Sequence, residues 1–598
     1  MFDETRDPLL SGLETHRASR LQFRILTLVF AAALIMILLF SRLFYLQIIQ
    51  GDSLREQAHG NRVRTKPLLA PRGNIYDFSG KIVASNQEAH TLYFDPRRLS
   101  NPQIYQTLQA LAQYLETDFE SLRDRLDFEA LQPVYLYHDL SPEKLALILE
   151  HRDRLPGITI STNLERYYPA RDKMTHFLGH MGQISSKELK DPTYRHYFAG
   201  TMIGKGGLER TYELFLKGAD GKEQQEFALE KNAEPQRVTV PPIPGHRLQL
   251  TIDLDLQNFC YEQLKKSGVA GSVVVMDPRD GAVRALVSYP AYDPQLFNQG
   301  LSQKQWKELQ DDKLHPFLDR STNSYAPGSI FKVVTTLAGL GTGKLTPERH
   351  FSSRGSLRVA GHLFYDWNRA GFGSVDIYDA LAFSIDTVFY ELSQEMGIEP
   401  IRDYALALGL GQKTGIDLPL EGVGIVPDRQ WKQKNLDSDW LPGDSVNASI
   451  GQGYVQMTPL QATRMIASVA NNGYLVTPHL VQSISGQPGL SLYPNAQLKP
   501  QKIPNIPQAH WQVVQQGLEE AVSRGTVKGL GVPGVRVAGK TGTAETIPGQ
   551  PNHAWIVGYA PAEAPRYAIT VFLEHGRSGG GNAAPLGGRI LRHLFERS

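Results

Sequence analysis

The sequence has little cysteine, almost no net charge and few long hydrophobic runs. Cys260 is its only cysteine among 598 residues, which excludes an intrachain disulfide and a thiolate-rich metal site. Lysine and arginine number 62 against 61 for aspartate and glutamate, so the formal net charge is +1. A dedicated nucleic-acid-binding protein normally carries a strong basic excess, and we therefore expect no nucleic-acid partner. The 41% hydrophobic and 21% charged residues are typical of an ordinary globular protein.

One uncharged hydrophobic run stands near the N-terminus, between Arg24 and Arg42. Crossing a bilayer takes about 20 apolar residues. Residues 25–41 fall slightly short of that length, but the apolar character resumes after Arg42, whose long side chain can reach the interface. Three arginines come before the run or at its edge, which by the positive-inside tendency places the N-terminus in the cytoplasm: Arg17, Arg20 and Arg24.

A cleaved signal peptide is the alternative interpretation of this run. Its apolar region would span about 7–15 residues and end at a small-residue cleavage site. The run here is longer and is followed by Arg42-Leu-Phe-Tyr-Leu-Gln. We therefore predict a cytoplasmic tail at residues 1–24, a single transmembrane signal-anchor at 25–49, and the rest of the chain outside the cytoplasmic membrane.

The remainder divides into two regions at the proline-rich segment 241–245, since proline disfavours both helix and central strand. Residues 50–245 are mixed and irregular, and we predict a non-catalytic pedestal there. In residues 246–598, strand-like runs occur at both ends and mostly helical sequence lies between them. We predict an α/β fold of the α+β type, an antiparallel five-stranded sheet with an inserted helical subdomain. The predicted strands are 272–277, 282–288, 535–544, 554–560 and 567–574, with flanking helices at 255–266 and 586–595.

A Ser-x-x-Lys motif, Ser329 to Lys332, follows Pro327-Gly328, which predicts the start of a helix. Ser329 and Lys332 would then lie one turn apart on the same face. A serine becomes a nucleophile beside a base, and a desolvated lysine can be that base. The motif alone is weak, because it occurs again at Ser141 without supporting context.

Two further motifs follow in order along the chain. Ser384-Ile385-Asp386 comes first, and Lys540-Thr541-Gly542-Thr543 lies on a predicted strand. Glycine at 542 would let the backbone approach a substrate closely, and the lysine would supply a cation for a carboxylate. Each motif alone is weak, but the ordered set is specific.

With these motifs the sequence resembles the penicilloyl-serine transferases, and in particular the class B penicillin-binding proteins of the penicillin-binding protein 2 type. Two segments before the linker, 72–77 and 204–209, resemble conserved boxes of the class B non-catalytic module. Three further segments, 449–453, 458–461 and 470–473, match the helical core of the family. The resemblance covers nearly the whole chain after the anchor.

The resemblance implies a role for each motif residue. Ser329 would be the nucleophile, Lys332 its general base, and Ser384 the relay of the proton to the leaving amine. Asp386 would complete the second motif. The third motif would bind the terminal carboxylate of the substrate through Lys540, Thr541, Gly542 and Thr543, and the backbone amides of Ser329 and Thr543 would form the oxyanion hole.

The implied function is a peptidoglycan D,D-transpeptidase of cell elongation, anchored in the bacterial inner membrane with its catalytic domain on the periplasmic side. It would cross-link stem pentapeptides with release of D-alanine, bind β-lactams, and carry D,D-carboxypeptidation as a side activity. The expected partners are a SEDS-type membrane glycan polymerase and scaffold proteins of the elongation complex. No cofactor is expected.

Several alternatives share these motifs. A septal class B transpeptidase or a catalytically silent β-lactam-binding scaffold for a polymerase would carry the same domains. A serine β-lactamase or a D,D-carboxypeptidase would hydrolyse the acyl-serine, which requires a base that activates water. No residue matches the glutamate that class A β-lactamases use for deacylation, and a secreted hydrolase would not need the region 50–245.

We also expect no metal. Some relatives carry a zinc-like cluster between the first two motifs, but here only Asp366 remains, with Phe372 at the aligned histidine position. A lone His362 is more often a surface or structural residue. His176 and His180 have helical i, i+4 spacing, yet Phe177 stands where a zinc protease would need glutamate.

Asp386 departs from the asparagine of most relatives, although aspartate is tolerated in the penicillin-binding protein 2 type. A carboxylate beside two lysines favours their charged forms, which works against Lys332 as a neutral base. We therefore expect Asp386→Asn to keep penicillin acylation, measured by labelling with a fluorescent penicillin. A folded variant that takes up no label would contradict this expectation.

Overall fold

The computed structural model describes residues 8–51, 63–96, 99–123, 126, 134–137, 140–197, 201–226, 236–298, 301, 303–485 and 499–597. The chain divides into two compact units. One contains Met1–Leu69 and Ala219–Ile243, and the other contains Ala70–Gly218 and Pro244–Ser598.

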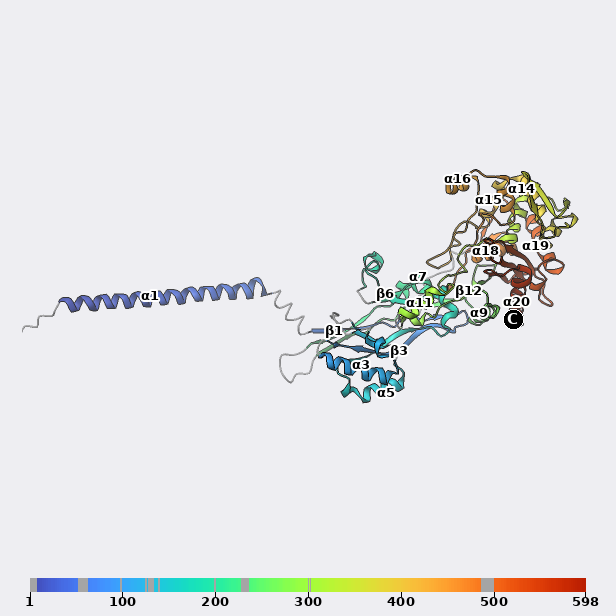
Figure 1. The fold of residues 1–598 in the computed structure, drawn as a ribbon. Coiled ribbons are helices and arrows are strands. Elements are labelled where there is room, and N and C mark those ends of the chain that lie inside the picture. Colours follow the sequence, from blue (N-terminus) through green and yellow to red (C-terminus); the bar gives the residue numbers. More distant parts are fainter. Residues whose placement is uncertain are drawn as a thin grey trace, which may run out of the picture. The chain divides into compact units, whose positions relative to one another are not determined.

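The first unit contains a long helix and a small sheet. Helix α1 (Pro8–Phe44) continues into one π-helical turn at Tyr45–Ile49 (Figure 1). The segment Phe23–Ile49, which includes the π-helical turn, is long and apolar enough to span a membrane, with a mean hydropathy of 2.6. The sheet has the antiparallel order β1-β8-β9, formed by Val63–Leu68, Gly221–Glu226 and Gln236–Val240.

The second unit begins with a six-stranded sheet. Its strands run in the order β18-β10-β2-β3-β4, and β5 pairs with β3 on a side branch. These strands are β2 (Ile75–Tyr76), β3 (Ile82–Phe94), β4 (Val134–Tyr137), β5 (Ile158–Tyr167), β10 (Arg247–Leu250) and β18 (Val481–Ser485). Helices α3 (Asn101–Leu115) and α5 (Pro142–Glu150) contribute to the apolar cluster beside β3, β4 and β5.

A buried ion-pair network lies in this region of the second unit. Arg72 Nε lies 2.6 Å from Glu209 Oε2, and Arg166 Nε lies 2.6 Å from Glu209 Oε1. Arg72 also contacts Glu213 at 2.7 Å. The network joins the two sequence boxes that start at Arg72 and end at Glu209, and charges removed from water in this way need their partners.

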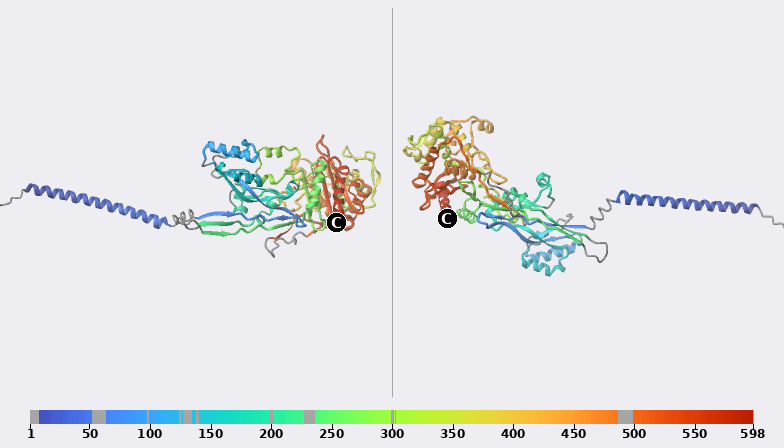
Figure 2. Two further views of the ribbon diagram at one scale, coloured as in Figure 1. Left: turned by 90° about the horizontal axis from the view of Figure 1, so that it is seen from below. Right: turned by 180° about the vertical axis from the view of Figure 1, so that it is seen from behind.

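The predicted five-stranded sheet of residues 246–598 is fully antiparallel in the order β12-β11-β22-β21-β20. Its strands are β11 (Gly271–Met276), β12 (Val283–Tyr289), β20 (Ala538–Ala544), β21 (His553–Ala560) and β22 (Tyr567–Leu573). Figure 2 shows the green strands from the start of this region beside the red strands from its end. The predicted five-stranded antiparallel sheet with a helical insertion is confirmed.

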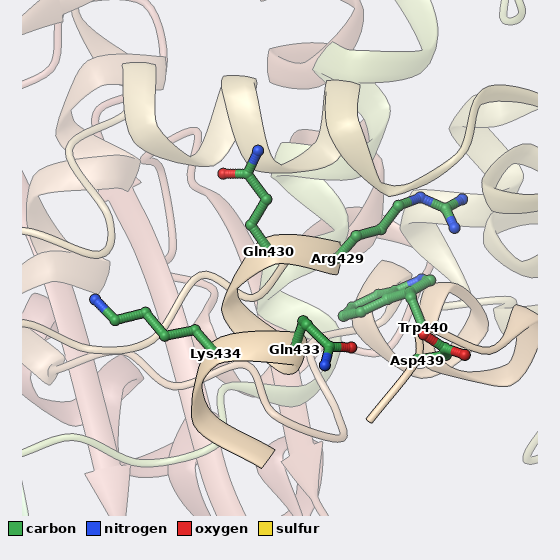
Figure 3. Close-up of a pocket in the computed structure, with 6 residues that line it drawn as sticks. All are labelled: Arg429, Gln430, Gln433, Lys434, Asp439 and Trp440. Atoms are coloured by element: carbon green, nitrogen blue, oxygen red, sulfur yellow. The ribbon is translucent and has the colours of Figure 1, made fainter. Parts of the chain in front are cut away.

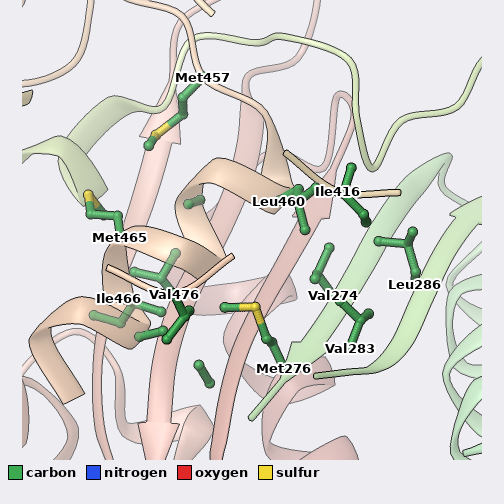
Figure 4. Close-up of a cluster of buried hydrophobic side chains, with 14 of the residues drawn as sticks. Val274, Met276, Val283, Leu286, Ile416, Met457, Leu460, Met465, Ile466 and Val476 are labelled. Carbon is green, nitrogen blue, oxygen red and sulfur yellow. The ribbon is translucent and has the colours of Figure 1, made fainter. Parts of the chain in front are cut away.

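Alternation along the strands gives the sheet two apolar faces. Val273 and Val275 face α9 (Leu254–Ser267) and α20 (Ala584–Glu596). Val274 and Met276 belong to the opposite core, with α18 (Pro459–Ala470), which is buried along its whole length (Figure 4). The sheet is therefore fixed on both sides, which makes it a rigid support for a site at its β20 edge.

The insertion between β12 and β20 contains more than the predicted helices. Its helices are α10 (Gln295–Asn298), α11 (Gln303–Asp311), α12 (Lys332–Gly341), α13 (Ile377–Ala382), α14 (Asp386–Met396), α15 (Ile398–Ala407), α16 (Arg429–Leu436), α17 (Pro442–Ser449), α18 and α19 (Gln508–Ser523). It also holds short strand pairs, β13 (Phe351–Ser353) with β16 (Gly373–Val375) and β14 (Ser356–Val359) with β15 (His362–Tyr365). The predicted strand 535–544 starts only at Ala538, because Val535 closes a turn onto Val532 O.

We expect Glu209→Gln to lower the free energy of unfolding by about 3–5 kcal/mol, because Arg166 and Arg72 then stay buried without their shared carboxylate. Thermal unfolding of the full chain measures the loss. Glu188→Gln is the matched control, since its ion pair with Lys205 is partly exposed and is worth under about 1 kcal/mol. Equal shifts in the two variants would contradict the expectation.

Candidate active site

The predicted nucleophile lies in a 3-10 turn, Gly328–Phe331, that leads into α12. Ser329 is half-buried in this turn, whereas the sequence predicted an α-helix there. Gly328 has φ +59°, and a Cβ on it would lie 2.6 Å from Thr543 O. Only glycine tolerates both conditions, so Gly328 brings the turn of Ser329 against β20.

Lys332 joins the first two motifs. Its side chain is fully buried, and its Nζ donates to Ser384 O at 2.8 Å and to Ser384 Oγ at 3.1 Å. The same Nζ lies 2.7 Å from Asp386 Oδ1. The structure therefore places the Ser-x-x-Lys lysine and both polar residues of the second motif in direct contact.

Ser384 lies at the bend between α13 and α14 and has φ +58°, in the left-handed region. Residues other than glycine rarely adopt this conformation, and it costs roughly 1–2 kcal/mol. The bend turns both the carbonyl and the hydroxyl of Ser384 toward Lys332. Such strain is often found at functional sites.

Two groups of the site have shifted pKa values. Burial raises the pKa of Asp386, although the adjacent Lys332 ammonium lowers it. Burial and the charge of Lys332 hold the pKa of Lys540 well below its ordinary value of 10.5. Lys540 is fully buried on β20, and its Nζ donates to Thr541 O at 3.4 Å. Perturbed pKa values that gather around one cluster are typical of active sites.

The third motif forms strand β20. Thr541 Oγ1 lies 2.9 Å from Thr526 Oγ1, while Thr543 is exposed and accepts from Gly579 N through its hydroxyl at 3.3 Å. A Cβ on Gly542 would lie 2.6 Å from Pro327 O. The glycine therefore lets β20 lie directly against the turn that carries Ser329.

Sequence reasoning missed several residues that complete this cluster. Gly451 O accepts from Gly328 N at 2.9 Å, and Gln452 Nε2 lies 3.5 Å from Thr543 O. The Ser-Ile-Gly-Gln-Gly segment that contains both was identified only as part of the helical core. Its glycine-rich pattern signals a close backbone approach, but which segment it approaches depends on the tertiary fold.

The two histidines with metal-pair spacing, His176 and His180, contact oxygen atoms of the protein. His176 Nε2 lies 3.3 Å from Pro290 O, and His180 Nδ1 lies 2.9 Å from Tyr292 Oη. Within the described ranges, no three histidine, cysteine, aspartate or glutamate side chains gather as they would around a metal. His362 is exposed, and Cys260 is buried in the core beside the five-stranded antiparallel sheet.

A separate hollow of about 730 Å³ lies beside α16 (Figure 3). Figure 3 shows the indole of Trp440 below Arg429. The six lining residues are Arg429, Gln430, Gln433, Lys434, Asp439 and Trp440. None of them belongs to the three motifs, so this hollow is distinct from the Ser329 cluster.

Two family models match the sequence. The penicillin-binding protein transpeptidase domain matches residues 271–592, more than half of the chain, and the penicillin-binding protein dimerisation domain matches residues 67–250. The chain belongs to the class B penicillin-binding proteins. The family and the enzyme class predicted from the motifs, a serine-type D,D-transpeptidase, are thereby confirmed.

Relatives of this penicillin-binding protein match along almost its entire length. It is 33% identical to the peptidoglycan D,D-transpeptidase MrdA of Acinetobacter baumannii, over 93% of this chain and 85% of the relative. It is 32% identical to MrdA of Haemophilus influenzae, over 94% of this chain and 89% of the relative. These matches place it in the penicillin-binding protein 2 type.

Solved structures of the same type are also similar. Penicillin-binding protein 2 in complex with MreC, from Helicobacter pylori, has a TM-score of 0.78 and 29% identity, over 90% of this chain and 99% of the solved chain. Penicillin-binding protein 2 of Pseudomonas aeruginosa has a TM-score of 0.66 and 31% identity, over 89% of this chain and 96% of the solved chain.

We expect Lys540→Met to stabilise this penicillin-binding protein at neutral pH, because burial disfavours the protonated form of Lys540 in the folded chain. The unfolded chain binds a proton at Lys540 that the folded chain holds poorly. The contribution of Lys540 to wild-type stability therefore rises with pH up to about 10.5, and the advantage of the variant shrinks over that range.

Thermal unfolding at several pH values measures this difference. Lys432→Met is the matched control, because Lys432 is also a buried lysine but forms an ion pair with Asp444 at 2.6 Å. Its replacement should destabilise the protein. Destabilisation by Lys540→Met at neutral pH would contradict the expectation.

Proposed function

We propose that this penicillin-binding protein cross-links the stem peptides of peptidoglycan during cell elongation, with Ser329 as the nucleophile. The main support for this proposal is that Lys332, one turn after Ser329, is fully buried and contacts both Ser384 and Asp386. The curated relatives named as peptidoglycan D,D-transpeptidases support this substrate.

In the acylation step, Ser329 Oγ attacks the carbonyl carbon of the penultimate D-alanine while neutral Lys332 takes the hydroxyl proton. The peptide bond to the terminal D-alanine breaks, and Ser384 passes a proton to the leaving amine. The hydrogen bond between Lys332 Nζ and Ser384 Oγ, at 3.1 Å, supports this relay. An amine of a neighbouring stem peptide then attacks the acyl-serine, forms the cross-link and frees Ser329.

Asp386 fits this scheme through its burial. Burial raises the pKa of Asp386, which favours its protonated form over the carboxylate. A carboxylic acid at position 386 stabilises an ammonium group less than a carboxylate does, which suits a lysine that acts as general base. An asparagine at 386 resembles the protonated acid in shape and hydrogen bonding, consistent with retained acylation in Asp386→Asn.

The β20 edge would receive the carboxylate end of the substrate. Protonated Lys540 would give this edge a positive potential, and Thr541 and Thr543 would donate hydroxyl hydrogen bonds to the substrate carboxylate. The near contact of Gly328 with Thr543 O supports an oxyanion hole made by the backbone N–H groups of Ser329 and Thr543. A β-lactam would occupy the same positions and leave a stable acyl-serine.

We further propose the topology that the sequence predicts. Residues 1–24 form a cytoplasmic tail, 25–49 the inner-membrane anchor, 50–245 the pedestal, and 246–598 the transpeptidase domain on the periplasmic side. The apolar span Phe23–Ile49 supports the anchor, and the family matches at 67–250 and 271–592 support two functional regions.

The proposed partners are proteins of the elongation machinery. One similar structure is a complex of penicillin-binding protein 2 with MreC, and another is described as a peptidoglycan synthase complex that coordinates polymerisation and cross-linking. The second has a TM-score of 0.71 and 28% identity to this chain. A scaffold protein and a SEDS-type glycan polymerase are therefore the partners we assign to this chain.

Labelling with a fluorescent penicillin tests the proposed chemistry. Wild type should form a long-lived adduct, and Ser329→Ala should form none, because the nucleophilic oxygen is missing. Ser141→Ala is the matched control: it has the same Ser-x-x-Lys pattern, but its hydroxyl accepts from Lys144 N as a helix cap, so labelling should be unchanged. An adduct that disappears rapidly would indicate a β-lactamase, and no wild-type adduct would indicate a silent scaffold.

A further inference from the structure

Helix α14, which begins at Asp386, has no cap of its own. Its N-cap residue is Ile385, whose side chain cannot accept a hydrogen bond. The first N–H groups of a helix have no partner within the helix and require one from outside. Because Asp386 contacts Lys332, the position of this helix start determines the geometry of the second motif.

Asp366 supplies the missing cap from a distant part of the chain. It follows β15 and is 1% exposed. Its Oδ1 accepts from the N–H groups of Asp386 and Thr387. Its Oδ2 accepts from Thr387 Oγ1 at 2.6 Å and from Ser353 Oγ at 3.0 Å.

The neighbouring residue holds the other end of the same loop. Trp367 Nε1 donates to Phe383 O at 3.0 Å, although the Trp367 side chain is 63% exposed. The backbone N–H of Asp366 donates to Gly355 O at 3.0 Å, which fixes the segment to the β-hairpin region. Loop 383–387 is therefore held at both ends by two consecutive residues.

The hydrogen bonds of Asp366 and Trp367 to this loop explain how Ser384 keeps its left-handed backbone conformation. A residue with φ +58° relaxes unless its surroundings fix it. Hydrogen bonds to residue 383 on one side and to 386 and 387 on the other leave the loop no room to relax. The Ser384 carbonyl and hydroxyl then stay within 2.8 and 3.1 Å of Lys332 Nζ.

We propose that Asp366 is a positioning residue of the transpeptidase reaction: its buried carboxylate caps α14 from outside and holds the Ser384-Ile385-Asp386 loop around Lys332. This role rests on the proposed function, because it acts through the residues assigned there to proton transfer. It requires no contact between Asp366 and the substrate.

The test measures the limiting acylation rate and the apparent Kd for a fluorescent penicillin, on the full-length protein in detergent. Asp366→Ala should lower the limiting rate roughly tenfold to a hundredfold, as expected from a displaced catalytic group, with little change in the apparent Kd. Asp366→Asn keeps an oxygen that can accept from both backbone N–H groups, and it should keep most of the rate.

Asp253→Ala is the matched control for stability. Asp253 caps α9 by accepting from Asp255 N at 3.0 Å and Leu256 N at 3.1 Å, so it also serves two backbone N–H groups. Its loss should lower the Tm and leave the limiting rate unchanged. A wild-type rate in Asp366→Ala, or an Asp366→Asn rate as low as that of Asp366→Ala, overturns the proposal.

A second pair of variants decides the matter if Asp366→Ala does not fold. Thr387→Val removes one hydrogen bond to Asp366 and should lower the limiting rate, whereas Thr387→Ser keeps the hydroxyl and should restore it. Equal rates in this pair overturn the proposal. Labelling that persists in Ser329→Ala counts against the proposed function itself, whereas a label that depends on Ser329 and is insensitive to Asp366 counts against the positioning role alone.

Discussion

The site depends on the contacts of the buried Lys332 amine with Ser384 and Asp386. A lysine nitrogen removed from water needs close polar partners, and here a carbonyl, a hydroxyl and a carboxyl group all lie within 3.1 Å of it. These three partners come from the loop between α13 and α14, far from Lys332 in the sequence. The contacts of Lys332 therefore depend on the fold of the insertion. A shift in that loop would remove hydrogen-bond partners from a buried amine.

The second constraint is that positions 328 and 542 must be glycine. The turn that contains Ser329 and strand β20 approach so closely that a Cβ at Gly328 or at Gly542 would lie 2.6 Å from a backbone oxygen of the other segment. Trp555 Nε1 also donates to Ala326 O at 3.0 Å, which ties the turn to the neighbouring strand β21. The turn that contains Ser329 is thus positioned by backbone packing against a sheet with apolar cores on both faces.

The sequence predicted the sheet and the ordered motifs because both are local patterns. Alternating apolar runs identify strands, and each motif is only three or four residues long. The roles of Asp366 and of the segment at Gly451 could not be predicted, because both act through backbone groups of distant segments. In the sequence, Asp366 resembles only a remnant of a metal site, although a lone buried aspartate can equally cap a helix. The 3-10 turn at Ser329 was also missed, because contacts with β20 override helix propensity there.

The proline-rich segment 241–245 contains a border between the two compact units, between Ile243 and Pro244, and the chain after it joins a sheet with residues from before it. Strand β10 follows it directly and pairs on one side with β2 of the pedestal region and on the other with β18 of the transpeptidase region. Asp417 adds a second connection, since it accepts from Tyr212 Oη at 2.9 Å and from Leu480 N at 2.8 Å. Prolines stop a strand but leave the next one free to join a shared sheet. Residues 70–218 therefore share one compact unit with residues 244–598.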